Sequence, residues 1–421
     1  MESEASQSFF TNDAIVFGIL AIVLAGVFYT SSLTNKYWKG FYRFVPPLFL
    51  CYFIPALLNY PLNLISGDVS KIYNITANYL LPACLVLLCL SVDFKSILKL
   101  GPKALIMFLT GTVGVIIGGP VALLMVTRFF PGLISAPADE LWRGFSTVAG
   151  SWIGGGANQT AMKEIYQVND NLFGTMVVVD IVVANLWMGF LLYSATIRTA
   201  FDRWLKADTS AIDELITKVS SFQTEVNKIP STTELFYLIA IAFGSVALGH
   251  WCADLIVPAL DQHAEVLKVW KLHAIISKFF WVVLITTTLG LWLSFTKARQ
   301  LEGVGASKWG TVFIYLLVAS IGMKMNLKEV SQNLGLFVVG FIWILVHAGL
   351  LLLVARLIRA PLFFLAVGSQ ANIGGAASAP VVASAFNPAL APVGVLLAVL
   401  GYALGTYGAI ICAQLMFALV K

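Results

Sequence analysis

Long apolar stretches recur along this whole sequence, and they leave few folds open to it. About 20 consecutive apolar residues cross the hydrocarbon core of a bilayer as an α-helix. Of the 421 residues, 59% are hydrophobic and only 11% are charged, which is not the composition of a soluble domain. We therefore predict an all-α polytopic membrane protein with about 12 (11–13) transmembrane helices. The apolar stretches lie at 14–30, 43–61, 73–91, 103–128, 141–165, 171–196, 234–257, 273–295, 309–323, 334–357, 361–386 and 391–419.

Glycines interrupt the stretch at 141–165. The run Gly150–Met162 holds four glycines within about two helical turns. A glycine inside a helix costs roughly 1 kcal/mol relative to alanine, so we expect the helix to break here. A break at membrane depth is tolerated only where the backbone is buried in protein or lines a wet cavity. Around this break lie Ser151, Gly154, Gly155, Gly156, Asn158, Gln159 and Thr160.

A second interrupted stretch, at 361–386, carries a related motif. Ile373–Ser378 reads Ile-Gly-Gly-Ala-Ala-Ser and aligns with Ile153–Asn158, which reads Ile-Gly-Gly-Gly-Ala-Asn. Two interrupted apolar segments at corresponding places in two halves indicate the binding site of a transporter. The alternative is that small residues merely let neighbouring helices pack closely. The second motif contributes Gln370, Asn372, Gly374, Gly375 and Ser378.

The two halves correspond beyond these motifs. Leu87–Lys95 resembles Leu316–Lys324, and each is followed by an unbroken, an interrupted and a last long apolar stretch. Between the halves, apolar residues recur at three- and four-residue steps within a hydrophilic segment, which indicates an amphipathic helix that does not span the membrane. The expected units are a first repeat at 1–197, this linker at 198–232 and a second repeat at 233–421.

The direction of the second half relative to the first stays open. Each half holds six stretches by this count, which makes the halves parallel. An inverted repeat needs an odd number of membrane spans in each half. Basic residues favour cytoplasmic loops, yet the count puts Lys95 and Lys99 on one side and Arg356 and Arg359 on the other. We favour an inverted repeat and expect that one span is miscounted between 128 and 300.

Asp180 lies midway along the stretch at 171–196. A carboxylate there costs several kcal/mol unless it is paired, hydrated or protonated. It therefore marks the path of an ion or a proton, or it is a buried structural hydrogen-bonding group. Sodium prefers several oxygen ligands, whereas a proton carrier needs only the carboxylate. The surplus of neutral oxygens favours sodium, and the candidate ion ligands are Asp180, Ser151, Asn158, Gln159, Thr160, Asn372 and Ser378.

The glycines and the other amides are the candidates for binding a solute. Half-helix N-termini at the breaks carry partial positive charge, which suits an anionic or zwitterionic solute. We predict sodium-coupled symport of a small organic anion or an amino-acid- or peptide-like solute by alternating access. The alternative is a cation–proton antiporter with Asp180 as the carrier. The candidate substrate-binding residues are Gly154, Gly155, Gly156, Gln370, Gly374, Gly375 and Asn185.

Other functions lack their signatures in this sequence. It contains no G-x-S-x-G, H-E-x-x-H or phosphate-loop motif, so we expect no enzyme and no cofactor besides a coupling sodium ion. The five cysteines show no C-x-x-C spacing and are expected as buried thiols. No basic cluster with interleaved aromatic residues indicates nucleic-acid binding. Lys163 and Glu164, after the first motif, are expected as a helix-end pair at the membrane interface.

The run Gly150–Asn158, together with Asp180, Asn185, Trp187 and Met188, resembles an uncharacterised, mostly bacterial family of membrane proteins, the YjcL-like family. The similarity extends over nearly the whole chain. The family looks distantly related to the cation–proton antiporters, the bile acid–sodium symporters and the sodium–glutamate symporters. This resemblance implies two inverted repeats, a core with two crossing broken helices, a scaffold that forms a homodimer, and elevator-type alternating access.

The resemblance also implies a place in the bacterial inner (plasma) membrane, with membrane lipids and a small-molecule solute as partners. It puts the two breaks at Gly150–Thr160 and Gly368–Ser378. Val179 stands beside Asp180, so the paired acids of the electrogenic antiporters are missing, which favours symport. A small carboxylate or a short peptide is the solute that the analogy implies.

Overall fold

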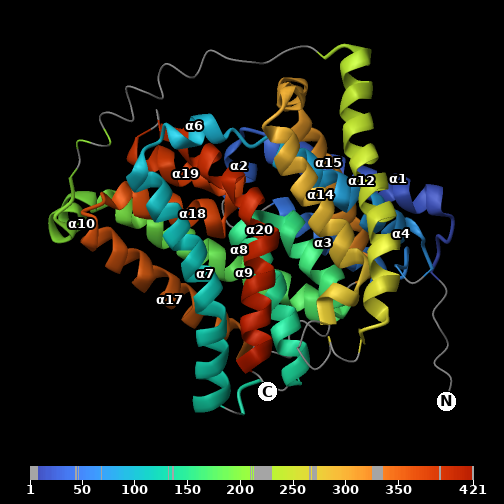
Figure 1. Ribbon diagram of the computed structural model, residues 1–421, viewed down its shortest axis with the longest axis horizontal. Helices are drawn as coiled ribbons and strands as arrows, with labels where there is room; N and C mark the ends of the chain where they lie inside the picture. Colours follow the sequence, from blue (N-terminus) through green and yellow to red (C-terminus); the bar gives the residue numbers. More distant parts are fainter. Residues whose placement is uncertain are drawn as a thin grey trace.

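Every regular element of the described chain is a helix, which confirms the predicted all-α class (Figure 1). Among the described residues, seven helices are long and apolar enough to cross a membrane, and two bent pairs raise this number to nine. The predicted number of about 12 spans is therefore not reached on length and composition. The computed structural model describes residues 8–42, 45, 47–67, 69–130, 132–134, 137–208, 210, 212, 230–264, 267, 273–324, 335–387 and 390–419.

The candidate membrane helices occur along the whole chain. The seven long ones are α1 (Asp13–Ser32), the continuous run Ile72–Leu90 formed by α4 (Ile72–Ile75), η1 (Thr76–Leu80) and α5 (Leu81–Leu90), α7 (Pro102–Phe129), α9 (Asp170–Thr196), α12 (Thr232–Asp261), α17 (Gly335–Leu357) and α20 (Ala391–Leu419). The bent pairs are α2 (Lys36–Tyr42) with α3 (Pro47–Asn59), and α14 (Lys278–Ser294) with η3 (Lys297–Val304). A shorter apolar helix is α15 (Ala306–Gly322).

The first interrupted stretch folds back on itself as a helical hairpin. Within α8 (Ala138–Tyr166), Gly155 has φ 75° and ψ −175°, outside the helical region. The Nη1 of Arg143 donates to the carbonyl of Tyr166 at 3.0 Å, and the rings of Trp142 and Tyr166 lie 5.1 Å apart. In a straight helix these ends would be about 35 Å apart. The chain therefore enters and leaves on one side, and we call α8 hairpin 1.

The second interrupted stretch has the same shape. It consists of α18 (Leu362–Ile373) and α19 (Gly375–Phe386), which meet at Gly375 with φ 60°. At its base the rings of Phe363 and Phe386 lie 5.6 Å apart, and near its tip the Nε2 of Gln370 donates to the Oγ of Ser378 at 2.7 Å. We call α18 and α19 together hairpin 2.

The predicted breaks are present, but the expected pair of crossing broken helices is wrong. A positive φ at a single glycine redirects the backbone, and here each break reverses the chain instead of letting it continue across. Each arm of hairpin 2 has 12 residues, or about 18 Å of helix. That length covers only part of a hydrocarbon core of about 30 Å, so an arm of this hairpin is too short to cross the membrane.

The two hairpins begin on opposite faces of the molecule. Helix α9 connects them, because Asp170 follows hairpin 1, and Arg198 donates through Nη1 to the carbonyl of Phe386 at the base of hairpin 2. The 27 residues of α9 extend about 40 Å, which is more than the thickness of the hydrocarbon core. The hairpin tips consequently point toward each other from the two faces.

Contacts between helices divide the structure into two bundles (Figure 1). The core bundle consists of both hairpins with α7, α9, α17 and α20, and the scaffold bundle consists of α1, α3, α4, α5, α12, α14 and α15. Helix α7 packs along α17 in the core, and α5 packs along α15 in the scaffold. The bundles meet where α5 and α14 contact hairpin 1 and α20.

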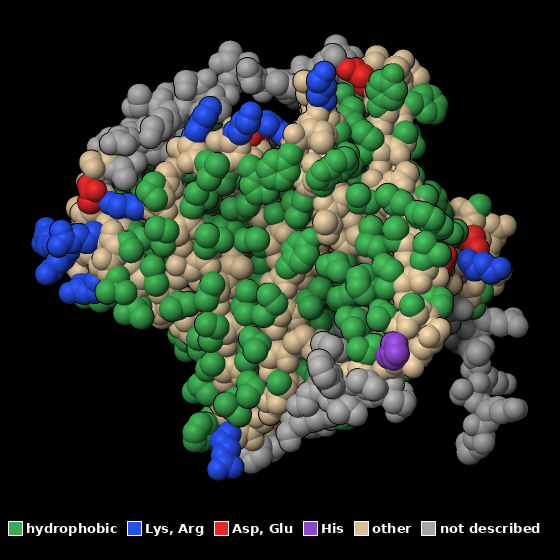
Figure 2. Space-filling model, in the orientation of Figure 1, with side chains coloured by type: hydrophobic (Ala, Val, Ile, Leu, Met, Phe, Trp, Pro, Cys, Tyr) green, Lys and Arg blue, Asp and Glu red, His purple; other side chains and the backbone are tan. Residues whose placement is uncertain are grey.

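Basic residues gather on one face, along the upper and left edges of Figure 2. The Nη2 of Arg299 lies 2.6 Å from Asp93, the Nζ of Lys103 lies 2.8 Å from Asp208, and the backbone N–H of Asp208 donates to the carbonyl of Arg359 at 3.0 Å. The hydrogen bond from Lys103 lowers the pKa of Asp208 to about 2, so this carboxylate stays charged. The loops after α5, α9, α14 and α17 therefore share one face.

This shared face resolves the conflict in the sequence count, which had put these basic loops on two sides. The error arose from counting the first interrupted stretch, at 141–165, as a crossing, which is within the region 128–300 where a miscount was expected. Of the predicted linker at 198–232, the structure describes α10 (Arg198–Leu205), the residues up to 208, single residues at 210 and 212, and 230–232. The predicted amphipathic helix beyond 212 lies outside the described residues.

A paired-cysteine experiment tests the reversal of the chain. We expect Phe363→Cys combined with Phe386→Cys to form a disulfide under mild oxidation, because these side chains face each other at the base of hairpin 2. A straight helix would hold the two positions about 35 Å apart, far beyond disulfide reach. Mass spectrometry of the linked peptides is the measurement, and each single variant is a control. Absence of the link in a folded double variant would show that the stretch is not a hairpin.

Candidate functional site

The tips of both hairpins lie against one part of α20. A Cβ on Gly401 would lie 2.6 Å from the carbonyl oxygen of Ile153 and 3.8 Å from that of Ala371. One turn further along α20, a Cβ on Gly405 would lie 2.6 Å from the Cα of Gly154. Only glycine permits such contacts between backbones. The two glycine motifs, more than half the chain apart in sequence, are therefore brought together at α20.

Both tips border space that the described residues do not fill. A Cβ on Gly156 or on Gly375 would meet no atom within 4 Å, and one on Gly155 would meet only the ring of Tyr402 at 3.6 Å. These tip residues are half-buried, whereas Ile153 and Ala157 beside them are buried. Solvent or a small solute can therefore reach the backbone at the tips.

Each tip presents two helix ends of opposite polarity to this space. The first arm of a hairpin ends there with unpaired carbonyl groups, and the second arm begins there with unpaired N–H groups. The macrodipole adds partial negative charge at the first end and partial positive charge at the second. The segments Gly150–Thr160 and Gly368–Ser378 contain no charged side chain. The backbone itself is therefore the main source of charge at the tips.

Asp180 is buried on α9 and accepts three hydrogen bonds from hairpin 1. Its Oδ2 accepts from the Oγ of Ser151 at 2.6 Å and from the Nε2 of Gln159 at 3.1 Å, and its Oδ1 accepts from the Nε1 of Trp152 at 2.6 Å. Ser151 and Trp152 belong to the first arm and Gln159 to the second. One carboxylate thus holds both arms against α9, and with a single donor only Oδ1 keeps room for a further partner.

An asparagine connects each hairpin to a neighbouring core helix. The Nδ2 of Asn158 donates to the carbonyl of Gly154 at 2.9 Å, and its Oδ1 accepts from Thr406 of α20 at 2.6 Å. Asn372 of hairpin 2 accepts through Oδ1 from Thr112 of α7 at 2.8 Å. Each of the two amide oxygens predicted as ion ligands therefore already accepts one hydrogen bond from a protein donor.

The remaining predicted residues fall into two groups. Thr160 donates to the carbonyl of Gly156 at 2.9 Å, and Ser378 accepts from Gln370, so these side chains lie close to the tips. The Oε1 of Gln370 is buried and has no hydrogen-bond partner within the described chain. Asn185 instead donates to the carbonyl of Ile181 in its own helix at 2.7 Å, and its side chain shows no hydrogen bond to either motif among the described residues.

Hairpin 2 has an anchor that the sequence analysis did not identify. The Nε1 of Trp187 on α9 donates to the Oγ of Ser369 at 2.8 Å, and the Nε2 of His347 on α17 lies 2.8 Å from the same oxygen. The Nδ1 of His347 lies 3.0 Å from the carbonyl of Gly111 on α7. Two helices, α9 and α17, thus meet at one hydroxyl of hairpin 2, and His347 extends the contact to α7. The only available signal was a set of isolated polar residues within apolar stretches.

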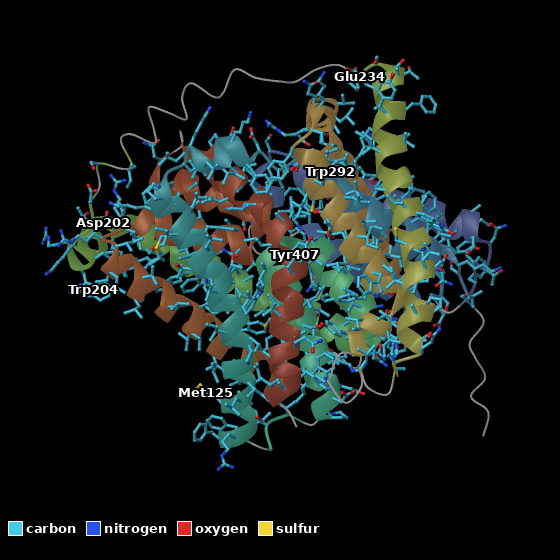
Figure 3. The ribbon with its side chains drawn as sticks, viewed as in Figure 1. Met125, Asp202, Trp204, Glu234, Trp292 and Tyr407 are labelled. Carbon is cyan, nitrogen blue, oxygen red and sulfur yellow. The ribbon has the colours of Figure 1, made fainter. Side chains whose placement is uncertain are left out.

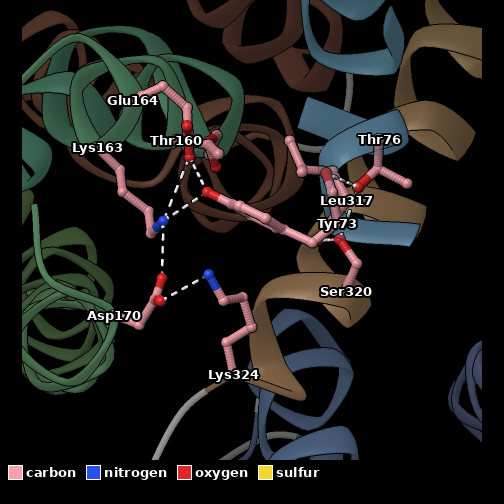
Figure 4. Close-up of polar contacts among 10 residues, drawn as sticks. Tyr73, Thr76, Thr160, Lys163, Glu164, Asp170, Leu317, Ser320 and Lys324 are labelled. Carbon is pink, nitrogen blue, oxygen red and sulfur yellow. Dashed lines mark hydrogen bonds and ion pairs between the residues drawn. The ribbon is translucent and has the colours of Figure 1, made fainter. Parts of the chain in front are cut away.

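An ionic network joins hairpin 1 to the scaffold bundle (Figure 4). The Nζ of Lys163 lies 3.2 Å from Glu164, 2.9 Å from Asp170 and 2.6 Å from the hydroxyl of Tyr73, which also donates to Glu164. Asp170 binds Lys324, after α15, at 2.9 Å. Lys163 and Glu164 form the expected pair at the end of α8, but Lys163 is buried and the pair is part of this larger network. Its ammonium is retained there because two carboxylates and a hydroxyl surround it.

The described residues contain no group of three or more His, Cys, Asp or Glu side chains that could hold a metal ion. A sodium ion needs neutral oxygens more than such a cluster. Oxygens with free capacity near the tips include the Oε1 of Gln370, the Oδ1 of Asp180 and the carbonyl groups at the ends of the first arms. The predicted ion and substrate ligands stay predictions.

Replacement of Asp180 separates its structural role from its predicted role as an ion ligand. We expect Asp180→Asn to lower stability by about 2–3 kcal/mol in sodium and in potassium, because its amide N–H groups would face the donors of hairpin 1. Ser151→Ala, which removes one of the three bonds, should cost less. Thermal melting in both salts is the measurement. An unchanged melting temperature in potassium would contradict the structural role, and a retained sodium response would contradict the ligand role.

Known proteins resemble this chain over most of its length. The chain is 24% identical over 344 residues to the "Uncharacterized membrane protein YjcL" of Bacillus subtilis (strain 168), which covers 80% of this chain and 82% of that protein. Residues 18–419 match the model of the family described as "Protein of unknown function (DUF819)". The predicted resemblance to the YjcL-like family is confirmed, whereas the distant relationship to antiporters and symporters stays a prediction. The chain is an integral membrane protein that belongs to the DUF819 family.

Proposed function

We propose that this protein is a secondary active transporter that carries a small organic anion, or an amino-acid- or peptide-like solute, together with sodium by alternating access. The observation that supports this most is the approach of two hairpin tips from opposite faces to Gly401 and Gly405 of α20. Interrupted helices that meet inside the membrane and present their ends to a solute are typical of secondary transporters. Such a site can open to either face without a continuous pore.

The polarity of the helix ends supports cotransport of an anion with a cation. The second arms begin at Gly156 and Gly375, where N–H groups attract an anionic group. The first arms end at the same tips, where carbonyl groups and the Oε1 of Gln370 attract a cation. An anion and sodium bound together also avoid the cost of burying either charge alone.

The alternative is a cation–proton antiporter with Asp180 as the carrier. A carboxylate that carries a cation or a proton must exchange it with the space at the tips. Asp180 is only 6% exposed, and its oxygens face three donors of hairpin 1. This placement favours symport, with Asp180 holding hairpin 1 in position.

We also propose that the two halves are inverted repeats. Because neither hairpin crosses the membrane, the crossings are α1, α3, α5, α7 and α9 in the first half and α12, α14, α15, α17 and α20 in the second, an odd number in each. When the crossings of the two halves are matched in order, α1 corresponds to α12, α3 to α14 and α5 to α15. The contacts agree with this correspondence, because α1 packs on α3 as α12 packs on α14, and α3 packs on α15 as α14 packs on α5. In this arrangement the face with the basic loops is the cytoplasmic face. The membrane is then the inner membrane of a bacterium.

Within this proposal, the core bundle moves against the scaffold bundle as in an elevator, and the scaffold forms the homodimer. The network of Lys163, Asp170 and Lys324 connects the two bundles near the base of hairpin 1. Such a movement has to separate these ion pairs. The network consequently favours the state of the structure described here over the opposite end state.

Blocking the space at the tips is the most direct test of transport. We expect Gly156→Leu to reduce sodium-driven uptake of the solute at least tenfold, because the new side chain projects into the space at the tips without a clash at its Cβ. Gly26→Leu on the exposed surface of α1, where a Cβ also meets no atom within 4 Å, is the matched control. Both variants should melt near the parent temperature.

Proteoliposomes with an inward sodium gradient and a panel of labelled carboxylates and peptides supply the uptake measurement. Uptake that needs sodium, is lost in Gly156→Leu and is kept in Gly26→Leu is the expected result. Collapse of a pH gradient on addition of sodium, without solute uptake, would favour the antiporter. Normal uptake by Gly156→Leu would show that the tips do not form the site.

A further inference from the structure

A groove of about 450 Å³ lies on the surface of the core bundle, between α9, α17 and α18. Its lining is apolar apart from Ser194 and includes Trp187, Phe190, Leu345 and Leu365. Phe190 is 50% exposed and Leu345 is 68% exposed, so the groove opens on the outer surface of the core bundle. A groove of this shape and depth accommodates a hydrocarbon chain.

One end of the groove is basic. Phe201 of α10 and Leu362 at the start of α18 line that end, where α10 packs against α18. Figure 2 shows basic side chains grouped at the left edge, where Figure 3 labels Asp202 and Trp204 of α10. The exposed basic residues of α10 and of the end of α17 are Arg198, Arg203, Lys206, Arg356 and Arg359.

Among the described residues, the acidic side chains at this end do not neutralise the basic group. Asp202 accepts a hydrogen bond from the backbone N–H of Leu362 at 2.8 Å, and Asp208 pairs with Lys103. Arg356 donates to a neutral partner, the carbonyl of Trp204, and lies over its ring at 5.0 Å. The basic end therefore has a net positive charge beside an apolar groove.

We propose that this groove binds an anionic phospholipid of the surrounding membrane, with an acyl chain along α9 and α17 and the phosphate among the basic residues of α10 and α17. Apolar walls at membrane depth and a cationic end at the membrane surface match the two parts of such a lipid. A soluble anion would leave the groove unfilled, and a zwitterionic lipid would lack the net charge that the basic end attracts.

The groove is connected to the candidate transport site through one side chain. Trp187 lines the groove, and its indole N–H donates to Ser369 of hairpin 2. An acyl chain in the groove therefore packs against the residue that anchors hairpin 2. We expect the bound lipid to stabilise the folded core bundle, an effect that can be measured without knowing the transported solute.

The test compares thermal melting of the purified full chain in nanodiscs of phosphatidylcholine with and without phosphatidylglycerol. The parent should melt several degrees higher with the anionic lipid. Arg203→Gln combined with Arg359→Gln should lose most of this increase, and Lys36→Gln combined with Lys39→Gln, on α2, should keep it. Ala348→Phe, which fills the groove, should also lose the increase. Gly349→Phe, at the next and exposed position where a Cβ meets no atom within 4 Å, is its matched control.

Native mass spectrometry of the same variants counts the retained phosphatidylglycerol molecules. We expect one molecule fewer than in the parent for Arg203→Gln combined with Arg359→Gln, and likewise for Ala348→Phe. An equal increase in all variants would overturn the proposal, as would an increase in the parent produced by soluble glycerol phosphate alone. If Ala348→Phe does not fold, the comparison of the two glutamine pairs decides the question by itself.

Discussion

The close approach of the hairpin tips to α20 is the constraint on which the rest of this structure depends. Gly154 and Gly405 face each other so closely that neither can carry a side chain, and Gly401 lies against the carbonyl of Ile153. Helix packing in a bilayer gains little from the hydrophobic effect, so contact between small residues and polar bonds must supply the stability. The broken helices also leave N–H and C=O groups unpaired inside the membrane. Packing the tips against α20, with Asn158 bonded to Gly154 and Thr406, limits that cost.

The two hairpins share a shape but are held by different chemistry. Hairpin 1 is fixed through the carboxylate of Asp180, whereas hairpin 2 is fixed through Ser369, which bonds to Trp187 and His347. The buried Oε1 of Gln370 without a partner is also in hairpin 2. Hairpin 1 is additionally connected to the scaffold by the ionic network of Lys163. The tip of hairpin 2 is therefore the better candidate for binding a cation, and hairpin 1 is the better candidate for coupling the site to the proposed movement of the bundles.

Much of the fold could be predicted from residues alone, and the parts that could not have a common physical cause. Composition determined the all-α membrane class, and the glycine runs marked both breaks within a few residues of Gly155 and Gly375. The direction of the chain after a break is not set locally, because a glycine permits both a kink and a reversal. The reversal depends on contacts such as Arg143 with Tyr166, which no periodicity reveals. Asp180 was recognised as a buried acid, but its partner Trp152 was not, because an indole in an apolar run gives no polar signal. The predicted number of spans was too high for the same reason that the expectation of crossing helices was wrong, because each break reverses the chain.

We propose that both tips line one space inside the membrane although their hairpins begin on opposite faces. The most direct measurement is labelling of Gly156→Cys and Ala376→Cys by a membrane-impermeant maleimide, applied to either side of oriented vesicles, with the parent as the background. Our account predicts that both cysteines react from the same side under a given condition and change together when sodium and a transported solute are added. Reaction of each cysteine only from the face at the base of its own hairpin, regardless of sodium and solute, would contradict it.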